Sequence, residues 1–291
     1  MTAARFIAAC CRVFNSSKGV NYCLEYHKSN SKETTVRSWE FVLSRFESQF
    51  GDRELDSISP DEVLSFLREC TEGTKQSTKR SRYAVLSAFF NLIKNTIDPG
   101  VENPCSTPML RKLFRPAKIT HWTILEKEVV DEIIFRTVKP RNRLLLELMA
   151  RGGMRISEVL KLSPRDVDGR KLILRDPKSG KQTEVVFIPQ KIADRLKAYT
   201  EEKSIEPNEQ IFELTYQGAR AVVNKAGKLV GIHLRPHDLR RHAATHASRS
   251  GTPIEIVSKV ILRHANLSTT QRYLGKVSET EALRWIENVY A

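Results

Sequence analysis

The sequence predicts a mainly α-helical protein with a small β-sheet, and three observations support this prediction. Apolar residues recur at helical spacing through residues 17–98. Two short β-branched runs, KLILRD at 171–176 and TEVVFIP at 183–189, lie within an otherwise helical second half. Between these regions stand helix-breaking residues, namely Pro99, Gly100, Pro104, Pro108 and Pro116.

These features divide the chain into four parts. We expect an N-terminal extension over residues 1–16, a helical domain over 17–98, a linker over 99–118 and a second domain over 119–291. A chain of 291 residues is long enough for two domains that each bury their own core.

Three segments of the first domain read as helices. The stretch 31–51 carries apolar residues at helical spacing and ends at Gly51. The next helix should begin at Ser59-Pro60-Asp61-Glu62, which supplies a capping hydroxyl, a proline at the first position and acidic residues in the first turn. A third helix is expected from Thr78 to Thr96.

The second domain alternates helices with one hairpin. Its two β-branched runs are joined by residues 177–182, PKSGKQ, whose composition indicates a turn. Helices are expected at Glu126–Thr137, Arg141–Ala150, Ile156–Leu162, Ile192–Lys203, His237–Arg249, Pro253–Arg263 and Ser278–Tyr290.

The charge of the chain indicates a polyanionic partner. Lys and Arg exceed Asp and Glu by 14, and most of the excess follows residue 110. Residues 1–110 carry a net charge of +1, whereas residues 111–291 carry +13. A basic half of this kind is typical of nucleic-acid binding, although some well-solvated proteins are also basic.

Two basic clusters are candidates for contacts to phosphates. One opens the third helix and the other lies in the linker. Their members are Lys75, Lys79, Arg80, Arg82, Arg111, Lys112 and Arg115.

The cysteines and the apolar runs exclude other classes. Five cysteines, all within the first 105 residues, form no CxxC pair, so neither a disulfide framework nor a zinc site is indicated. No apolar run reaches the ~18 residues that span a bilayer. We expect no membrane association and a cytoplasmic protein.

Common catalytic motifs are absent from the sequence. It contains no GxxxxGK[ST] phosphate loop and no GxGxxG after a strand. His242 and His246 have the spacing of zinc ligands, but Ala243 stands where HExxH has its Glu, so we predict no metal site. What remains in the basic half is a set of arginines, histidines, a hairpin lysine and a tyrosine, which suits metal-free attack on a phosphodiester.

Four sequence boxes carry a resemblance to a known family. Gly153-Met154-Arg155-Ile156-Ser157-Glu158 resembles a first arginine box, and His237-Asp238-Leu239-Arg240-Arg241-His242 resembles HxLRH with one extra Arg. Leu262-Arg263-His264, followed by Thr269-Thr270-Gln271-Arg272-Tyr273, resembles LGHxxxxTTxxY, and the hairpin from Lys178 to Pro189 resembles KTGK…VP. Over residues 120–291 the sequence thus resembles the tyrosine recombinases, the superfamily of phage integrases, Xer and Cre.

The resemblance implies a fold and a set of roles. Residues 17–98 would form the helical core-binding domain, and 119–291 the α+β catalytic domain with a C-terminal exchange helix. Tyr273 would attack the scissile phosphate and form a 3′-phosphotyrosyl bond, while Arg155 and Arg240 bind its non-bridging oxygens. His237 would accept or orient the tyrosine proton, His264 would donate a hydrogen bond to the developing charge, and Glu158 would support the site.

The leaving 5′ oxygen requires an acid, and two lysines compete for this role. Lys178 is favoured by the resemblance of KSGK to the family segment, whereas counting back from Pro189 favours Lys181. Arg241 adds charge beside the site and is a further candidate for DNA contact. Met154 and Arg263 stand where the family pattern has Leu and Gly, and we expect both departures to be mild.

The resemblance implies double-stranded DNA as partner, a dimer on each site, a tetramer in the synapse, association with the nucleoid and no cofactor. The reaction would serve integration or excision of a mobile element, or resolution of chromosome dimers. A type IB topoisomerase would share the catalytic residues without assembling four protomers. A non-catalytic DNA-binding protein would account for the charge alone.

Overall fold

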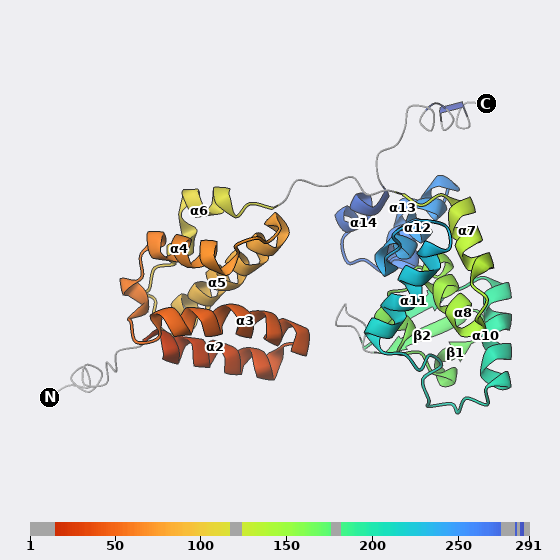
Figure 1. Cartoon of the computed structure of the whole chain (residues 1–291), viewed down its shortest axis with the longest axis horizontal. Helices are drawn as coiled ribbons and strands as arrows, with labels where there is room; N and C mark the ends of the chain where they lie inside the picture. The colour runs from red at the N-terminus through yellow and green to blue at the C-terminus, as the bar shows by residue number, and fades with distance from the viewer. Residues whose placement is uncertain (1–14, 117–123, 176–181, 275–282, 284–285, 288–291) are drawn as a thin grey trace. The chain divides into compact units, whose positions relative to one another are not determined.

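The computed structural model describes residues 15–116, 124–175, 182–274, 283 and 286–287. The chain divides into two compact units, Met1–Thr120 and His121–Ala291, and each unit has its own hydrophobic core. Both units are mainly helical, and the described strands all lie in the second (Figure 1). The predicted fold class is therefore confirmed.

The first unit is built from helices around a core rich in phenylalanine. The ring of Phe46 packs against those of Phe50, Phe66, Phe89 and Phe90 at centroid separations of 5.0–5.7 Å. The helices are α2 (Ser16–Asn30), α3 (Glu33–Phe50), α4 (Pro60–Cys70), α5 (Gln76–Thr96) and α6 (Pro108–Leu113), with 3₁₀ turns η2 (Leu55–Ser57) and η3 (Pro104–Ser106).

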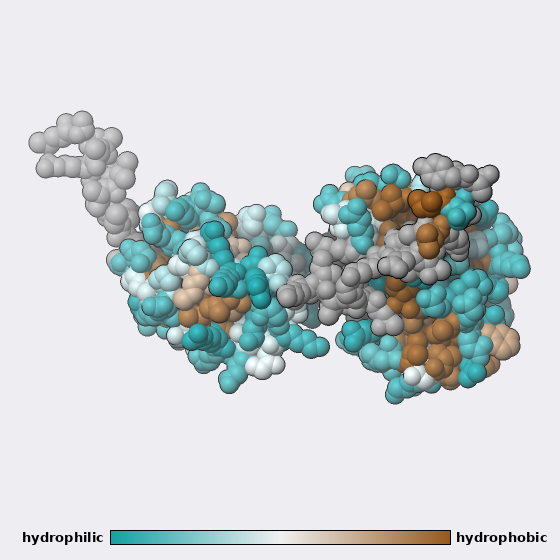
Figure 2. Space-filling model, turned by 90° about the horizontal axis from the view of Figure 1, so that it is seen from above, coloured by the Kyte–Doolittle hydropathy of each residue, from teal (hydrophilic) through white to brown (hydrophobic). Residues whose placement is uncertain are grey.

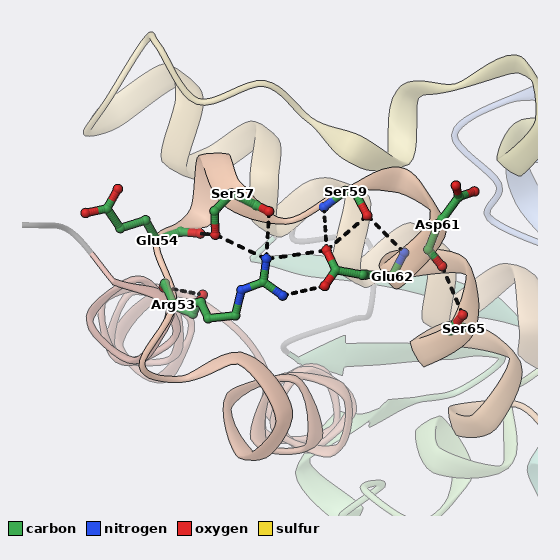
Figure 3. Close-up of polar contacts among 8 residues, drawn as sticks. Arg53, Glu54, Ser57, Ser59, Asp61, Glu62 and Ser65 are labelled. Carbon is green, nitrogen blue, oxygen red and sulfur yellow. Dashed lines mark hydrogen bonds and ion pairs between the residues drawn. The ribbon is translucent and has the colours of Figure 1, made fainter.

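Helix α4 begins at Ser59, as the sequence predicts, and its first turn has a complete capping box (Figure 3). Glu62 accepts a hydrogen bond from the Ser59 amide at 2.9 Å, and Ser59 Oγ accepts one from the Glu62 amide at 3.3 Å. Arg53 also pairs with Glu62 and donates to the carbonyl of Ser57 at 2.7 Å. The hydrogen bond from Arg53, followed by those from Ser59, lowers the pKa of Glu62 to about 2, and the same contacts connect the loop before α4 to the helix.

The segment predicted as a linker belongs largely to the first unit. Cys105, Leu110 and Phe114 are buried in its core, and Tyr83 donates a hydrogen bond to the Cys105 carbonyl at 2.8 Å. Pro104 and Pro108 stand at the first positions of η3 and α6. These prolines do not interrupt a helix, because the residue at the first position of a helix does not need to donate a backbone hydrogen bond. The predicted linker 99–118 is thus wrong up to Pro116, and residues 117–123 lie outside the described part.

The second unit packs helices around a three-stranded antiparallel sheet in the order β1-β2-β3. In the register, Leu172 lies opposite Val186 and Leu174 opposite Glu184, and these inward-facing residues are buried. The strands are β1 (Val167–Asp168), β2 (Lys171–Arg175) and β3 (Thr183–Phe187). The hairpin between β2 and β3 therefore forms where the sequence places it, although residues 176–181 are not described.

The helices of this unit follow the predicted order with shifts of a few residues. They are α7 (Lys127–Arg136), α8 (Pro140–Arg151), α9 (Ile156–Val159), α10 (Gln190–Glu202), α11 (Tyr216–Lys228), α12 (Pro236–Arg249), α13 (Ile254–Ile256), the π-helix η5 (Val257–Ile261) and α14 (Leu267–Leu274), with a 3₁₀ turn η4 (Pro164–Asp166). The sequence reading missed α11 and α14. The predicted helix Ser278–Tyr290 lies almost wholly outside the described residues.

The surfaces of both units are mixed. In Figure 2 the visible face of the first unit is mostly hydrophilic, whereas that of the second shows apolar patches among hydrophilic residues. Exposed apolar side chains of the second unit include Phe135, Val138 and Phe187. Of the described helices, none combines the length and the apolar character that a bilayer crossing requires.

Candidate active site

The site is built on a glycine turn between α8 and α9. Gly153 has a φ of 60°, in the left-handed region that favours glycine, and a Cβ added here would lie 2.8 Å from the carbonyl oxygen of Ile261. The Gly153 carbonyl accepts hydrogen bonds from Arg240 and, at 3.4 Å, from Arg263. The turn thus brings the first box against the segment that precedes His264.

Glu158 holds Arg155 from the first turn of α9. Its Oε1 lies 2.5 Å from Arg155 Nη1, and its Oε2 accepts a hydrogen bond from the Arg155 amide at 2.8 Å. Burial alone would raise the pKa of Glu158, but the positive charge of Arg263, the Arg155 amide and the charges of Arg155 and Arg240 together hold it below its ordinary value. Glu158 is therefore an ionised carboxylate, and the Arg155 side chain keeps 21% exposure.

Arg240 is the largest fully buried side chain among the described residues, with 1% of its surface exposed. Its two terminal nitrogens donate to the carbonyls of Gly153 and Leu262, and Nη1 lies 3.9 Å from Glu158 Oε2. A buried guanidinium is costly unless it is paired and hydrogen-bonded. These contacts from two distant segments fix its position.

His264 follows a π-helical turn, a feature that often marks functional sites. Its amide donates to the Ser258 carbonyl at 2.9 Å. Its Nδ1 lies 3.0 Å from Thr270 Oγ1, and the Thr270 hydroxyl is 2.9 Å from Ser258 Oγ. Burial, followed by the charges of Arg240, Arg155 and Arg263, lowers the pKa of His264 to about 4, so the ring is neutral at neutral pH.

Arg263, which the sequence reading treated as a mild departure, is a central member of the site. Its side chain is 4% exposed, and Nη2 lies 2.6 Å from Glu158 Oε2. Nη1 donates to the Ile261 carbonyl at 2.8 Å, and Nε lies 3.5 Å from Glu184 Oε2 on β3. The signal available in the sequence was the charge itself, because a cation in place of glycine requires a partner when it is buried.

The structure describes only some of the other predicted catalytic residues. His237 is exposed in the first turn of α12, and Tyr273 lies in α14, three residues after Thr270. Lys178 and Lys181 lie outside the described residues. The structure thus brings Arg155, Glu158, Arg240 and His264 together and leaves the nucleophile and the acid as predictions.

The two basic clusters of the first unit lie close to each other. Gln76, at the start of α5, donates to the carbonyls of Leu113 and Arg115 at 2.9 and 3.0 Å. The end of α6 therefore lies beside the start of α5. Of the predicted DNA contacts, Lys75, Arg111, Lys112 and Arg115 are exposed, and Lys79 and Arg80 are half-buried.

Two predicted DNA contacts also have partners within the protein. Arg82 donates to the Cys70 carbonyl, and its guanidinium lies 4.4 Å from the centre of the Phe41 ring. Arg241 is buried and donates to Asp238 at 3.1 Å. Arg241 is buried, so its prediction as a DNA contact is corrected, whereas Arg82 is half-buried like Lys79 and Arg80 and stays a prediction.

The structural boundary also changes the division of charge. Residues 1–120 contain 18 basic and 13 acidic residues, a net charge of +5, and residues 121–291 carry +9. The sequence analysis divided the charge at residue 110, whereas the first unit extends to residue 120. The segment between these two boundaries adds four cations, namely Arg111, Lys112, Arg115 and Lys118. Both units are therefore basic.

Buried arginines that are fixed in place around a neutral histidine are typical of a site that binds a phosphate group.

Comparison with known proteins agrees with a site that acts on the phosphates of DNA. Residues 124–279 match the phage integrase family. Tyrosine recombinase XerA of Thermococcus kodakarensis is 34% identical over 248 residues, which cover 82% of this chain and 83% of that protein. Tyrosine recombinase XerC of Thermodesulfovibrio yellowstonii is 25% identical over 272 residues, covering 86% and 88%.

Solved structures share the fold. The Tn1549 transposon integrase, in complex with a circular intermediate DNA, superposes with a TM-score of 0.72 at 15% identity, covering 94% of this chain and 99% of that chain. A lambda integrase dimer bound to a core site gives a TM-score of 0.71 at 15% identity, covering 91% and 97%. The chain belongs to the phage integrase family and is a tyrosine-type site-specific DNA recombinase.

Proposed function

We propose that the protein cleaves and rejoins double-stranded DNA through a 3′-phosphotyrosyl intermediate on Tyr273. The tyrosine oxygen attacks the scissile phosphorus, the bond to the 5′ oxygen breaks, and the energy of the phosphodiester is kept in the new bond. Religation is the reverse step with a different 5′ hydroxyl, so the cycle requires neither ATP nor a cofactor.

One observation supports this proposal most directly. Arg155 and Arg240, from two separated boxes, both lie beside Glu158, and His264 from a third box is close enough for the charges of both arginines to lower its pKa. The pentavalent transition state carries extra negative charge on its non-bridging oxygens, and planar guanidinium groups bind two oxygens at once. Arg155 and Arg240 would supply these contacts.

The proton transfers are assigned to three further residues. His237 accepts or orients the tyrosine proton, and its exposed place on α12 leaves it accessible to substrate. The leaving 5′ oxygen takes a proton from Lys178, with Lys181 as the alternative.

His264 would donate from Nε2 to the developing charge. A neutral ring has one proton, so Nδ1 must then accept a hydrogen bond. In the structure the Thr270 hydroxyl donates to Ser258 Oγ at 2.9 Å, and turning that hydroxyl toward Nδ1, 3.0 Å away, would supply the donor that this tautomer requires.

DNA binding is assigned first to the exposed cations just before α5 and in α6, chiefly Lys75, Arg111 and Lys112. We further propose a dimer on each recombination site, a tetramer in the synapse and association with the nucleoid. The C-terminal segment is the candidate for contacts between protomers, since Leu283 and Ile286 are 66% and 58% exposed. A role like those of the Xer recombinases or of mobile-element integrases fits the relatives.

A nicked suicide substrate tests the chemistry. The wild-type protein should form a covalent complex with the DNA, and Tyr273→Phe should form none while retaining DNA affinity. A covalent complex with the Phe variant would refute the assignment of the nucleophile. Detection of complexes with four protomers and two duplexes would separate a recombinase from a type IB topoisomerase.

A substrate with sulfur in place of the leaving 5′ oxygen identifies the acid. Sulfur leaves without a proton, so the Ala variant of the true acid should recover cleavage on it, whereas Arg155→Ala should not. We expect recovery for Lys178→Ala. Recovery for Lys181→Ala alone would reverse the assignment, and recovery for neither would direct attention to His237.

A further inference from the structure

Five charged side chains of the second unit form one network of contacts. They are three arginines and two glutamates, namely Arg155, Arg240, Arg263, Glu158 and Glu184. Glu158 lies 2.5 Å from Arg155, 2.6 Å from Arg263 and 3.9 Å from Arg240. Glu184 joins the network through Arg263, whose Nε lies 3.5 Å from its Oε2. The network therefore holds one more positive charge than negative charges.

Arg263 belongs to this network in spite of an unfavourable backbone conformation. Its φ is 52°, in a region that long side chains rarely adopt, and its side chain is 4% exposed. Such a residue persists only where its surroundings hold it. Its nitrogens contact both carboxylates and the carbonyls of Gly153 and Ile261. The guanidinium is thus engaged within the protein, and what it can offer to a phosphate is its charge.

Glu184 explains why the network needs a third arginine. It faces inward from β3, and 6% of its side chain is exposed. A buried carboxylate requires a cation nearby, and the ion pair that the structure shows for Glu184 is the one with Arg263. Among the described residues, neither Glu184 Oε2 nor Arg263 Nε has a hydrogen-bond partner. The interaction between these two side chains therefore depends on charge more than on a directed hydrogen bond.

The excess positive charge of the network is available to a phosphate at Arg240. The terminal nitrogens of Arg240 donate to the carbonyls of Gly153 and Leu262, which are neutral groups and leave its charge in place. Of the three distances from Glu158 to an arginine, the one to Arg240 is the longest. Without Arg263, two arginines would face two carboxylates, and the network would have no net charge.

We propose that Arg263 acts through its charge: it compensates Glu184, so that Arg155 and Arg240 keep a net positive charge for the scissile phosphate. This inference rests on the proposed phosphotyrosyl chemistry, in which the transition state carries more negative charge than the bound phosphodiester. A network without net charge would stabilise that transition state less. Arg263 does not touch the substrate and acts through the two arginines that do.

The test is a double-mutant cycle on single-turnover cleavage of the nicked suicide substrate. Arg263→Gly removes the cation and suits the backbone, and it should slow cleavage about tenfold, the order expected for one charge about 10 Å away at an effective dielectric constant of about 20. Glu184→Gln alone should not slow cleavage. The double variant restores the excess positive charge and should recover most of the lost rate. If Arg263 acted only through its contacts, the double variant would stay slow, because both partners are missing.

Two further variants separate the charge from the structure. Arg263→Lys keeps the charge without the planar fork and should cleave at close to the wild-type rate. Arg195 pairs at 2.7 Å with Glu147, a buried carboxylate of α8 outside the network, so Arg195→Gln is the matched control. It should lower the melting temperature and leave cleavage unchanged. If Arg263→Gly melts below the assay temperature, Arg263→Gln takes its place in the cycle, because glutamine fills the position without the charge.

An NMR titration of His264 measures the same charge without cleavage. The charge of Arg263 lowers the pKa of His264, after burial and the charges of Arg240 and Arg155. This pKa should rise above about 4 in Arg263→Gly and stay near the wild-type value in Arg263→Lys. Failure of the proposed chemistry is recognised separately, because the wild-type protein would then form no covalent complex while the titration still reports on Arg263.

Four results would overturn the proposal. They are a wild-type rate in Arg263→Gly, a slower rate in Glu184→Gln or no recovery in the double variant, a loss in Arg263→Lys equal to that in Arg263→Gly, and an unchanged pKa of His264 in Arg263→Gly.

Discussion

Protonation of His264 should make the second unit lose stability as the pH falls. Its pKa is about 4 in the folded protein, below the ordinary 6.5, because the ring is buried beside Arg240, Arg155 and Arg263. The unfolded chain therefore binds a proton below pH 6.5 that the folded protein resists. With respect to His264, the second unit therefore has its full free energy of unfolding above about pH 6.5, and this free energy decreases as the pH falls toward 4.

The size of this effect follows from the difference in pKa. Each unit of pKa corresponds to about 1.4 kcal/mol, so the shift of His264 represents about 3 kcal/mol between pH 7 and pH 4. The residue is 9% exposed, so solvent screens the effect little. The variant His264→Asn removes the titrating group, and its stability relative to wild type should improve by about this amount on acidification.

Native-state hydrogen exchange of the α12 amides measures this difference, because these amides report on opening of the second unit. His233→Asn, a change at an exposed histidine of the same unit, is the matched control and should not reproduce the effect. The reasoning is refuted if wild type and His264→Asn keep the same difference in free energy of opening at pH 7 and pH 4.

Three further perturbations test the site. Arg240→Lys should reduce single-turnover cleavage by 10²–10³-fold, roughly the effect of losing one preorganised donor, and full activity would exclude a bidentate role. Gly153→Ala should lower the melting temperature and cleavage together, because a Cβ would lie 2.8 Å from the Ile261 carbonyl, and an unchanged variant would show that the turn can adapt. Cleavage should persist in excess EDTA and without ATP; loss on chelation, restored by magnesium, would indicate a metal-dependent nuclease.

Local signals predicted most elements of the fold. The capping box at Ser59 and Glu62 and the paired strands of the hairpin form as the sequence indicates. The prolines after residue 98 led to the wrong prediction of a linker, because Pro104 and Pro108 in fact start short helices. Whether a proline breaks or begins a helix depends on its position in that helix, and here both prolines stand at first positions, with Leu110 of α6 buried in the first core.

Those residues of the candidate site that belong to the sequence boxes could be predicted from the sequence. The resemblance placed Arg155, Arg240 and His264 in one site, and in the structure the two arginines share Glu158 while their charges lower the pKa of His264. The position of Arg263 was not predictable in this way, because its partners Glu158 and Glu184 lie far away along the chain. A sequence motif does not indicate which distant residues meet in the fold, so it could not predict that Glu158 and Glu184 both pair with Arg263.

The adjacent arginines of α12 show why burial, more than residue type, decides function here. Successive residues of a helix are rotated by about 100°, so neighbours face different surroundings. Arg240 points to the Gly153 and Leu262 carbonyls, whereas Arg241 pairs with Asp238 one turn earlier. Both are cations in a basic half, and the sequence reading gave both a role at the DNA. Of the two, Arg240 contacts the Gly153 carbonyl and Glu158, which also hold Arg263, so its place in the proposed site follows from these contacts and not from charge alone.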